Sequence, residues 1–473
     1  MYVTCTYQDW AGTLESERPD LLETIIGDYK ASREFRDALE ADEYFRGNNK
    51  AVGSKVLLQP QTVPVRGENG KERKALWQKE IIGNRIFSGF LSRFVCQQNQ
   101  FLLGNGVTLD SPEQKERLGL GFDHALQQAG EKALLHGVCW GYWNLDRLEV
   151  IPAAVDARSG FVALLDERTG AARVGIQFWQ LAADKPMWVR LFEEDGLTEY
   201  KKTKDGLVVH APKRAYRLTY ARDAAGDELV GAANYSTLPV VPFFANAEKR
   251  GELTPSIKSK IDLYDRILSD FGDNLDKAND VYWVLNNFGG TMDDICEMLE
   301  QISRIKAVAN ISDGTTSSTA EPKSFEVPYQ ARRAALDILQ RQLYQDYMAL
   351  DMDELTGGSL TNVAIKAATA NLNLKADRYE WQAFSFVQGI LRLLGIKTER
   401  ITFKRQTIAN ETEIIQNIVA MRQDISHEKA LALNPYVMQE EIPQIMQDVA
   451  AEQMTGAPSM VELERMLREK DNG

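Results

Sequence analysis

A narrow apolar seam within residues 254–280 constrains the fold of this chain more than any other feature of its sequence. Apolar side chains recur there at steps of 4, 3, 4, 3 and 4 residues, which is the spacing of one stripe on an α-helix. They are Ile257, Ile261, Tyr264, Leu268, Phe271 and Leu275. Thr254 is a good capping residue and Pro255 suits a first helical position, so we expect a helix of about 40 Å to begin here.

The charges of this predicted helix oppose its own macrodipole. Lys258 and Lys260 stand near its start, whereas Asp273, Asp276 and Asp280 stand near its end. A helix N-terminus favours anions and a C-terminus favours cations, so the helix would be a poor one in isolation. We therefore expect neighbours packed along its length.

A compact insertion separates the seam helix from a second long helix, predicted over 329–350. Its predicted elements are strand 281–285, a turn at Gly289-Gly290, helix 292–303, strand 305–311, polar loop 313–320 and strand 324–327. Because the insertion returns the chain to where it left, the two long helices are expected to be antiparallel partners.

Two glycines and three acids interrupt the helical pattern at 351–361, Asp-Met-Asp-Glu-Leu-Thr-Gly-Gly-Ser-Leu-Thr. A third long helix is predicted over 362–394, ending at Gly395, and 400–404 is predicted as a strand. The remaining tail is predicted to be helical and to start with a capping box, Asn410 with Glu413 three residues on.

Helices also dominate the beginning of the chain. An amphipathic helix is predicted over 21–46, ending near Gly47. A polar loop is predicted over 67–74, followed by a well-buried helix over 76–103 that stops at Gly104.

From about 138 to 245 the pattern changes to short strands. Turns at Asp195-Gly196 and Asp205-Gly206 separate predicted strands 188–192, 197–201 and 207–210. The tryptophans and tyrosines of this region have two interpretations, stacking of single-stranded bases or core packing. Basic residues do not interleave densely enough for the first, so core packing is favoured. The fold class expected for the whole chain is α+β.

Composition narrows the class of protein. The chain has 473 residues, 44% of them hydrophobic, and a formal net charge of −13. Proteins that clamp DNA gain affinity by neutralising phosphates, so this charge argues against a DNA clamp. A conduit that lets DNA slide is compatible with an acidic wall. The alternative is that the charge merely keeps the protein soluble.

Neither membrane insertion nor a disulfide framework is indicated. The residues from Met1 to Trp10 lack a basic start followed by an apolar run, and no stretch approaches about 18 uninterrupted apolar residues, so a soluble, cytosolic chain is expected. The four cysteines show no Cys-x-x-Cys spacing and are expected to be reduced thiols. They are Cys5, Cys96, Cys139 and Cys296.

Signatures of catalysis are sparse. The Gly70-Lys71 pair lacks the upstream glycine of a phosphate-binding loop, so no ATPase is predicted. His136 and Cys139 suit a metal site or a nucleophile with its base, but packing in a buried segment is favoured. Asp293-Asp294 resembles an acid pair, yet it follows a glycine turn at a helix start, where capping is favoured. We expect no catalytic residue, no metal and no cofactor.

Short segments spread in order along nearly the whole chain carry a further signal. They are Tyr44-Phe45-Arg46-Gly47, Asn84, Phe101 to Val107, Leu238 to Asn246, Ser256-Ile257-Lys258, Ile261 to Asp270, Asn362 to Lys366, Ile401 to Arg405 and Asn410 to Gln416. None is a catalytic signature. Their order and spacing resemble the portal proteins of tailed phages, particularly those of siphophages of Gram-positive bacteria.

This resemblance implies an α+β portal fold with long stem helices, a β-rich wing, a small α/β clip and a helical crown, assembled as a ring. It assigns 1–253 to the wing, 254–280 to the first stem helix, 281–328 to the clip, 329–350 to the second stem helix, 351–361 to the tunnel loop, 362–405 to a long helix and wing strand, and 406–473 to the crown. The expected partners are copies of the chain in a ring of about twelve subunits, double-stranded DNA in the channel, the terminase large subunit, the head-completion adaptor, and the major capsid and scaffolding proteins, with no membrane.

By the same resemblance, two loops are the expected contact sites. The DNA-facing residues would be Asp351, Asp353, Glu354, Leu355, Thr356, Gly357, Gly358, Ser359 and Lys366. The clip surface that meets the motor and then the adaptor would be Asp313, Gly314, Thr315, Thr316, Ser317, Ser318 and Glu321. The chain departs from common family patterns at Asn48-Asn49, where a histidine is frequent, and at Gly357-Gly358-Ser359, where an asparagine is frequent.

The acids of 351–361 have three interpretations when the residues are taken alone: metal binding, a solvated loop, or an acidic lining. In the third, carboxylates repel phosphate and hold DNA off the wall, while the two glycines let the loop flex. Lys366 would either touch phosphates transiently or pair with those acids.

The leading hypothesis is a portal at the capsid vertex, present in the host cytoplasm during assembly and in the virion afterwards, through which DNA is packaged and ejected. A packaging enzyme is the competing class, and the missing phosphate-binding loop and the scarcity of histidines argue against it. An oligomeric scaffold of a prophage-derived particle is a third class, which the sequence does not separate from an active portal.

Overall fold

The computed structural model describes residues 5–53, 56–66, 72–223, 226–278, 281–286, 319–324, 329–352, 362–406, 411–421, 425–434, 437 and 442–455. The chain divides into two compact units, each described below by itself. The first unit combines residues 1–349 with 374–406, and the second combines 350–373 with 407–473.

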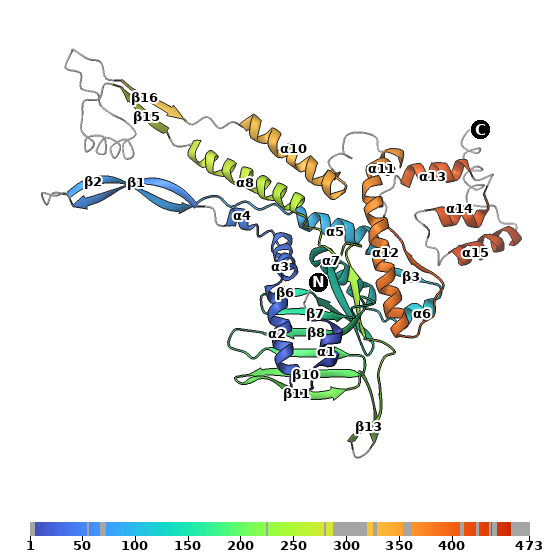
Figure 1. The fold of residues 1–473 in the computed structure, drawn as a ribbon. Coiled ribbons are helices and arrows are strands. Elements are labelled where there is room, and N and C mark those ends of the chain that lie inside the picture. The colour runs from blue at the N-terminus through green and yellow to red at the C-terminus, as the bar shows by residue number, and fades with distance from the viewer. Residues whose placement is uncertain are drawn as a thin grey trace, which may run out of the picture. The chain divides into compact units, whose positions relative to one another are not determined.

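A six-stranded antiparallel sheet, in the order β11-β10-β9-β8-β7-β6, forms one layer of the first unit (Figure 1). Its strands are β6 (Ala154–Asp156), β7 (Ser159–Leu165), β8 (Ala172–Trp179), β9 (Trp188–Glu193), β10 (Gly196–Thr203) and β11 (Gly206–Arg214). Gly196 and Gly206 stand at the predicted Asp-Gly turns with φ of 153° and 117°, which explains the need for glycine there. The predicted antiparallel strands 188–192, 197–201 and 207–210 are confirmed.

Helices from the start of the chain cover this sheet. They are α1 (Tyr7–Gly12), α2 (Arg18–Ala31) and α3 (Arg33–Phe45). Their buried side chains, which include Leu22, Ile26 and Phe35, pack with Ile176 and Leu191 of the sheet in one apolar core. The opposite face of the sheet is also apolar, because Phe161, Ala163 and Phe192 belong to a second core.

A second core lies around the three-stranded sheet β14-β4-β5. The strands are β4 (Val138–Asn144), β5 (Arg147–Pro152) and β14 (Val240–Phe244), and the helices around them are α5 (Phe90–Leu103), α7 (Phe122–His136) and α12 (Ala370–Leu393). The short helix α6 (Pro112–Glu116) has no buried side chain and lies outside this core. Phe243 of β14 stacks on Tyr379 and Phe386 of α12, with ring centroids 5.6 and 4.8 Å away. Trp140 and Trp143 are buried here, which confirms core packing for these aromatic residues.

Four two-stranded antiparallel sheets complete the strands of the first unit. They pair β1 (Val56–Arg66) with β2 (Glu72–Ile82), β12 (Arg217–Asp223) with β13 (Gly226–Ala233), β15 (Val281–Asn286) with β16 (Thr319–Ser324), and β3 (Val107–Leu109) with β17 (Ile401–Phe403). Three further helices are α4 (Lys50–Gly53), α8 (Pro255–Ala278) and α10 (Tyr329–Tyr347).

The second unit is helical within its described residues. Its helices are α11 (Asn362–Ala368), α13 (Glu411–Ala420), α14 (His427–Leu433) and α15 (Ile442–Thr455). Ser426 caps α14 by accepting a hydrogen bond from the Lys429 amide at 3.2 Å. The predicted cap at Asn410 lies outside the described residues.

The predicted helix over 21–46 is wrong at its centre, because the chain forms two helices that meet at Ser32. The Ser32 backbone is extended, and its hydroxyl accepts the Phe35 amide at 3.2 Å, so Ser32 caps α3. The break lets α2 pack on the six-stranded sheet while α3 packs against α7.

The predicted helix over 76–103 is wrong in its first part. Residues up to Ile82 form strand β2, paired along its whole length with β1, and helix α5 begins only at Phe90. The predicted polar loop over 67–74 is correspondingly too long, since β2 begins at Glu72. The partner strand β1 ends only a few residues before β2, at Arg66, but the apolar residues of 76–82 also fit a helical period, and periodicity alone does not separate the two.

The insertion is described in part. The predicted strand 281–285 is confirmed as β15, but its partner β16 spans Thr319–Ser324 rather than beginning at Ser324. The end of the predicted polar loop is therefore strand. The predicted helix 292–303 and strand 305–311 lie outside the described residues.

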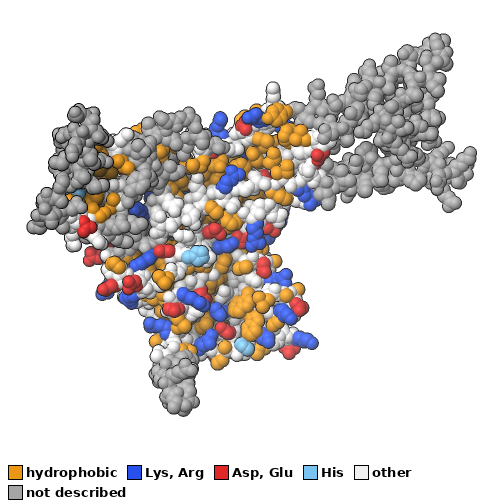
Figure 2. Space-filling model, turned by 180° about the vertical axis from the view of Figure 1, so that it is seen from behind, with side chains coloured by type: hydrophobic (Ala, Val, Ile, Leu, Met, Phe, Trp, Pro, Cys, Tyr) orange, Lys and Arg blue, Asp and Glu red, His pale blue; other side chains and the backbone are white. Residues whose placement is uncertain are grey.

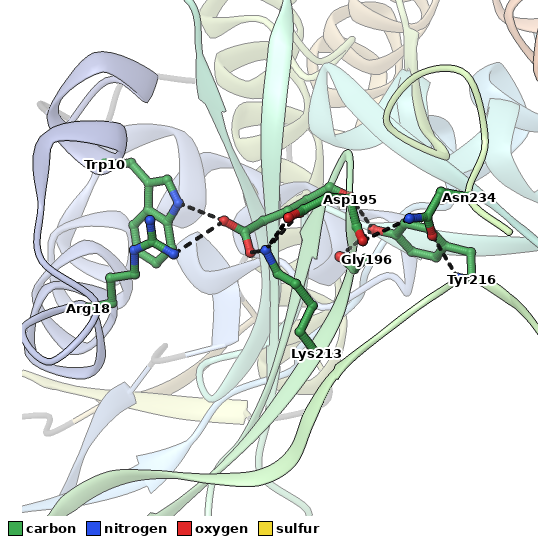
Figure 3. A network of polar contacts seen from close by, with 8 residues as sticks. Trp10, Arg18, Asp195, Gly196, Lys213, Tyr216 and Asn234 are labelled. Carbon is green, nitrogen blue, oxygen red and sulfur yellow. Dashed lines mark hydrogen bonds and ion pairs between the residues drawn. The ribbon is translucent and has the colours of Figure 1, made fainter. Parts of the chain in front are cut away.

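A polar network fixes the root of the β12–β13 hairpin (Figure 3). Tyr216 donates from its hydroxyl to the carbonyls of Glu193 and Gly196, at 2.6 and 3.0 Å. Asn234 accepts the Tyr216 amide at 3.1 Å and donates to the Asp195 carbonyl at 2.8 Å. The hairpin is thereby tied to the β9–β10 turn.

The carboxylate of Glu193 extends the network to the N-terminal helices (Figure 3). Trp10 donates to it at 3.0 Å, Lys213 lies 2.8 Å from it, and Arg18 lies 3.8 Å away. One strand end therefore anchors both a helix and a hairpin.

Candidate functional site: the long helix pair

Helices α8 and α10 lie side by side and run in opposite directions (Figure 1). At one end Ser256 donates to the Asp346 carboxylate at 2.9 Å, and Lys260 lies 2.5 Å from the same group. At the other end the rings of Phe271 and Tyr329 are 5.9 Å apart. The predicted antiparallel pairing of two long helices is confirmed.

The predicted seam of α8 is only partly buried within one chain. Ile257 and Ile261 are 3% and 2% exposed. Tyr264, Leu268 and Phe271 are half-buried, and Leu275 is 49% exposed. The apolar stripe is thus covered at the start of the helix and open towards its end.

From Asp265 onward, the most buried face of α8 is a polar stripe that its apolar spacing does not reveal. Asp265 and Ser269 are 0% exposed and Asp273 is 5% exposed. The Ser88 amide donates to Asp265 at 2.9 Å, the Ile86 amide to Ser269 at 3.0 Å, and the Asn84 amide to Asp273 at 2.6 Å. We call these three side chains the polar ladder.

The polar ladder forms because the spacing of its side chains along α8 matches the spacing of the amides along the segment 83–89. Its rungs are four residues apart on α8, and they meet alternate amides of the segment 83–89. Four helical residues advance about 6 Å, and two residues of an extended chain advance about 6.6 Å. The helix therefore satisfies the backbone of a segment that belongs to neither a strand nor a helix.

The ladder also explains acids that oppose the helix dipole. Asp273 and Asp276 stand near the C-terminal end of α8, where the dipole disfavours them, but each accepts a hydrogen bond from Asn84, at 2.6 Å in both cases. Burial raises the pKa of Asp265, although donors from Ser88 and Asn49 partly oppose this. The expectation that neighbours pack along this helix is confirmed.

A second set of polar contacts fastens the start of α8 to α3. The Tyr44 hydroxyl bonds Asp262, and Lys258 lies 3.0 Å from Asp262 and 3.6 Å from Glu40. The Lys258 ammonium also lies 5.3 Å from the Tyr44 ring centroid. Burial alone would lower the pKa of Lys258, but Asp262 and Tyr44 outweigh it and hold that pKa above its usual value.

An aromatic cluster joins the helix pair to α5. Phe90 meets Tyr264 edge-on with centroids 5.0 Å apart, and Phe94 meets Tyr344 at 5.1 Å. Phe94 also stacks on Tyr347 at 4.6 Å. These contacts place both long helices on one helix of the core.

The outer face of the pair keeps apolar side chains in solvent. Ile338 of α10 is 54% exposed and Leu263 of α8 is 43% exposed, whereas Tyr329 lies on the opposite side of α10 from Ile338, next to Phe271. Ala331 and Ala334 are also exposed on α10. With Ile338 they form one apolar stripe, at steps of three and four residues, in which two small side chains are followed by a large one. Figure 2 shows apolar side chains gathered over this part of the surface.

The two predicted contact loops are described only at their edges. Asp351 is half-buried at the start of 351–361, and residues 353–361 lie outside the described residues. Lys366 is exposed on α11. Residues 313–318 also lie outside the described residues, and Glu321 lies in β16 opposite Val284 of β15.

The His136 and Cys139 pair is not arranged as a reactive centre. His136 lies with its Nε2 3.1 Å from Asp42 on α3, and Cys139 is buried on β4 with its thiol directed to the Ile151 carbonyl at 3.5 Å. Burial raises the pKa of Cys139 to about 12, so the thiol stays protonated at neutral pH. The described part of the chain holds no group of three or more His, Cys, Asp or Glu side chains placed to bind a metal ion.

Asp42 supports a prediction on pH dependence. Its own burial acts to raise its pKa, but His136 and Lys132 outweigh burial, and the pKa lies below its usual 3.8. Ionised Asp42 therefore stabilises the fold above the unfolded pKa, and this stability is lost as pH falls through the lower folded pKa. Asp42→Asn is expected to lower the free energy of unfolding by about 1–3 kcal/mol at neutral pH, and the difference should shrink in acid.

Chemical unfolding at a series of pH values measures this difference. Asp37→Asn, an exposed change on the same helix, is the matched control and should have little effect. A difference between Asp42→Asn and the unaltered chain that stays constant down to strongly acidic pH would refute the assignment.

Among the described residues, no helix is both long and apolar enough to cross a bilayer. Comparisons with known proteins point to one family. A family model described as phage portal protein, SPP1 Gp6-like, matches residues 28–470. The portal protein of Clostridium phage phiCD119 is 30% identical over 187 residues, which are 38% of this chain and 41% of that relative. The portal protein of Bacillus phage SPP1 is 24% identical over 398 residues, which are 77% of this chain and 76% of that relative.

The chain spans less than half of the Clostridium phage relative and about three quarters of the Bacillus phage relative. The family model is the broader match, since it runs from the end of α2 to near the last residue. The chain therefore belongs to the SPP1 Gp6-like family of phage portal proteins.

Proposed function

We propose that copies of this chain assemble into a ring whose channel passes double-stranded DNA at the capsid vertex, first during packaging and later during ejection. The observation that carries the proposal is the long helix pair of a portal-family chain, with apolar side chains of its outer face left in solvent. A neighbouring copy would cover them. Heterologous contacts of this kind close into a ring when the rotation between subunits allows it.

The partners follow from the same proposal. Residues 281–328 would form the clip, which would meet the terminase large subunit during packaging and the head-completion adaptor afterwards. The β-rich region would face the major capsid and scaffolding proteins. Portal proteins are structural components, and we infer that the packaging motor is a separate protein.

Electron microscopy of the purified chain tests the ring directly. Class averages should show closed rings with a central hole wide enough for duplex DNA, with about twelve subunits. Uniform monomers at every concentration and ionic strength would contradict the proposal. Hydrolysis of ATP or cleavage of DNA by the pure chain would favour a packaging enzyme instead. Rings that never fill a head with DNA would favour a scaffold.

The acidic segment 351–361 is proposed to line the channel, with Gly357 and Gly358 allowing it to flex. Replacing both glycines with proline is expected to leave ring assembly intact and to reduce the amount of DNA in filled heads, because proline fixes φ and stiffens the segment. Electron microscopy of rings and quantification of encapsidated DNA measure the two effects. The matched control replaces both glycines with alanine, which stiffens the backbone less. Unchanged packaging by the proline variant would rule out a flexible lining.

A further inference from the structure

A buried lysine lies where α10 ends and α12 begins. The Lys375 ammonium is 2.7 Å from the Glu252 carboxylate, and it donates to the Tyr347 carbonyl at 2.9 Å. It also lies 3.2 Å from the centroid of the Tyr347 ring. The side chains of Lys375 and Glu252 are each 13% exposed. Burial lowers the pKa of Lys375, although Glu252 opposes this effect.

These contacts join three separate segments at one cation. Tyr347 is the last residue of α10, and Lys375 lies in the first turns of α12. Glu252 precedes α8, and its amide donates to the Leu134 carbonyl of α7 at 2.8 Å. Lys375 thus links both ends of the stretch 348–374 to the segment that leads into α8.

The end of α10 is itself fixed on the core. Its helix stops because Met348 takes a left-handed conformation, with φ of 63°, while the Ala349 amide returns to the Tyr344 carbonyl at 3.0 Å. The predicted end at 350 is therefore three residues too late. The Tyr347 hydroxyl donates to Gln98 of α5 at 2.8 Å, and its ring stacks on Phe94. Lys375 binds a helix end that cannot shift alone.

Stability does not explain why a lysine stands here. Taking two charges out of water costs about as much as their attraction returns, so an apolar pair of similar shape is commonly as stable or more so. An apolar pair, however, has no directional contacts and would let the end of α10 shift against the start of α12. An ammonium held by a carboxylate, a carbonyl and a ring face requires all three in one arrangement, and it also suits the negative end of the α10 dipole.

We propose that Lys375 is a positioning residue that keeps the end of α10 and the start of α12 in one fixed arrangement while DNA passes the segment between them. The proposal rests on the function proposed above, because only a channel would load that segment. The residue does not need to touch DNA. Its role is to hold the two ends of the stretch 348–374 in register.

The test uses the double variant Lys375→Met with Glu252→Met, which removes both charges and keeps similar volume. Its rings should form and should unfold at the same or a higher temperature than rings of the unaltered chain. Hydrogen exchange of peptides covering 344–352 and 370–378 should be about tenfold faster in those rings, and the yield of DNA-filled heads should fall about tenfold in phage complementation. Lys375→Arg keeps the charge and should restore part of both.

Each outcome bears on one idea. Exchange and head filling equal to those of the unaltered chain would overturn the role of Lys375. If the double variant makes no rings, Glu252→Gln decides, because it removes the charged partner of Lys375 and keeps its volume, and full head filling with unchanged exchange in its rings would also overturn the role. If the unaltered chain itself forms no rings or fills no heads, the proposed portal function fails instead.

Discussion

Replacing Ile338 with aspartate is expected to leave each chain folded but unable to form rings. Ile338 is 54% exposed on the outer stripe of α10, so little core packing is lost in the single chain. In the proposed ring the same position would lie against a neighbouring copy, where an unpaired carboxylate costs about 3 kcal/mol or more. That is a factor of roughly 100 or more in each subunit contact, and the cost recurs at every contact of the ring.

Native mass spectrometry and electron microscopy measure this effect, with thermal unfolding as the check on the fold. Leu181→Asp is the matched control, because Leu181 is 85% exposed in the loop between β8 and β9 and is not on the helix pair. The control should form normal rings. Normal rings from Ile338→Asp would show that the outer face of α10 is not a subunit contact.

Replacing Asp265 with alanine is expected to destabilise the chain itself. The Asp265 carboxylate is fully buried and accepts the Ser88 amide at 2.9 Å and the Asn49 side chain at 3.0 Å. Alanine leaves two buried donors without an acceptor, at about 1–3 kcal/mol each. The free energy of unfolding should therefore fall by about 2–6 kcal/mol, and exchange at the Ser88 amide should quicken.

Chemical unfolding and hydrogen exchange test this expectation. Asp337→Ala is the matched control, since Asp337 is an exposed acid on the partner helix α10 and is expected to cost little. If Asp265→Ala unfolds at the same denaturant concentration as the unaltered chain, the polar ladder contributes nothing to stability.

The sequence predicted the long helix pair well, because its signals are local. A threonine cap, a proline at the first position and apolar steps of four and three define α8 without reference to other segments. The Asp-Gly turns of the six-stranded sheet are equally local, and glycines stand there with positive φ. The predicted single helix over 362–394 is wrong at Thr369, where the chain divides into α11 and α12, but Gly395, with φ of 64°, follows the end of α12 close to the expected position.

The polar ladder could not be predicted, because it needs two distant segments at once. Asp265, Ser269 and Asp273 recur at steps of four, a pattern that is visible in the sequence but that also fits a solvated helix face. Nothing in that pattern names the amides of 83–89 as partners. The error at Ile82 has a different cause, since β1 is the preceding strand, and the short apolar run before Ile82 fits both a helix and a strand.

By itself, the sequence determined where the helix pair α8 and α10 lies, the α+β class and the family resemblance, since capping, periodicity and short motifs depend on neighbouring residues. Only the tertiary structure decided which face of α8 is buried and what the acids near its end bind, because a buried carboxylate takes its role from donors far along the chain. The apolar seam was the visible pattern. The polar ladder beside it lies deeper, because the free energy of burying its charges depends on hydrogen bonds that only the folded chain supplies.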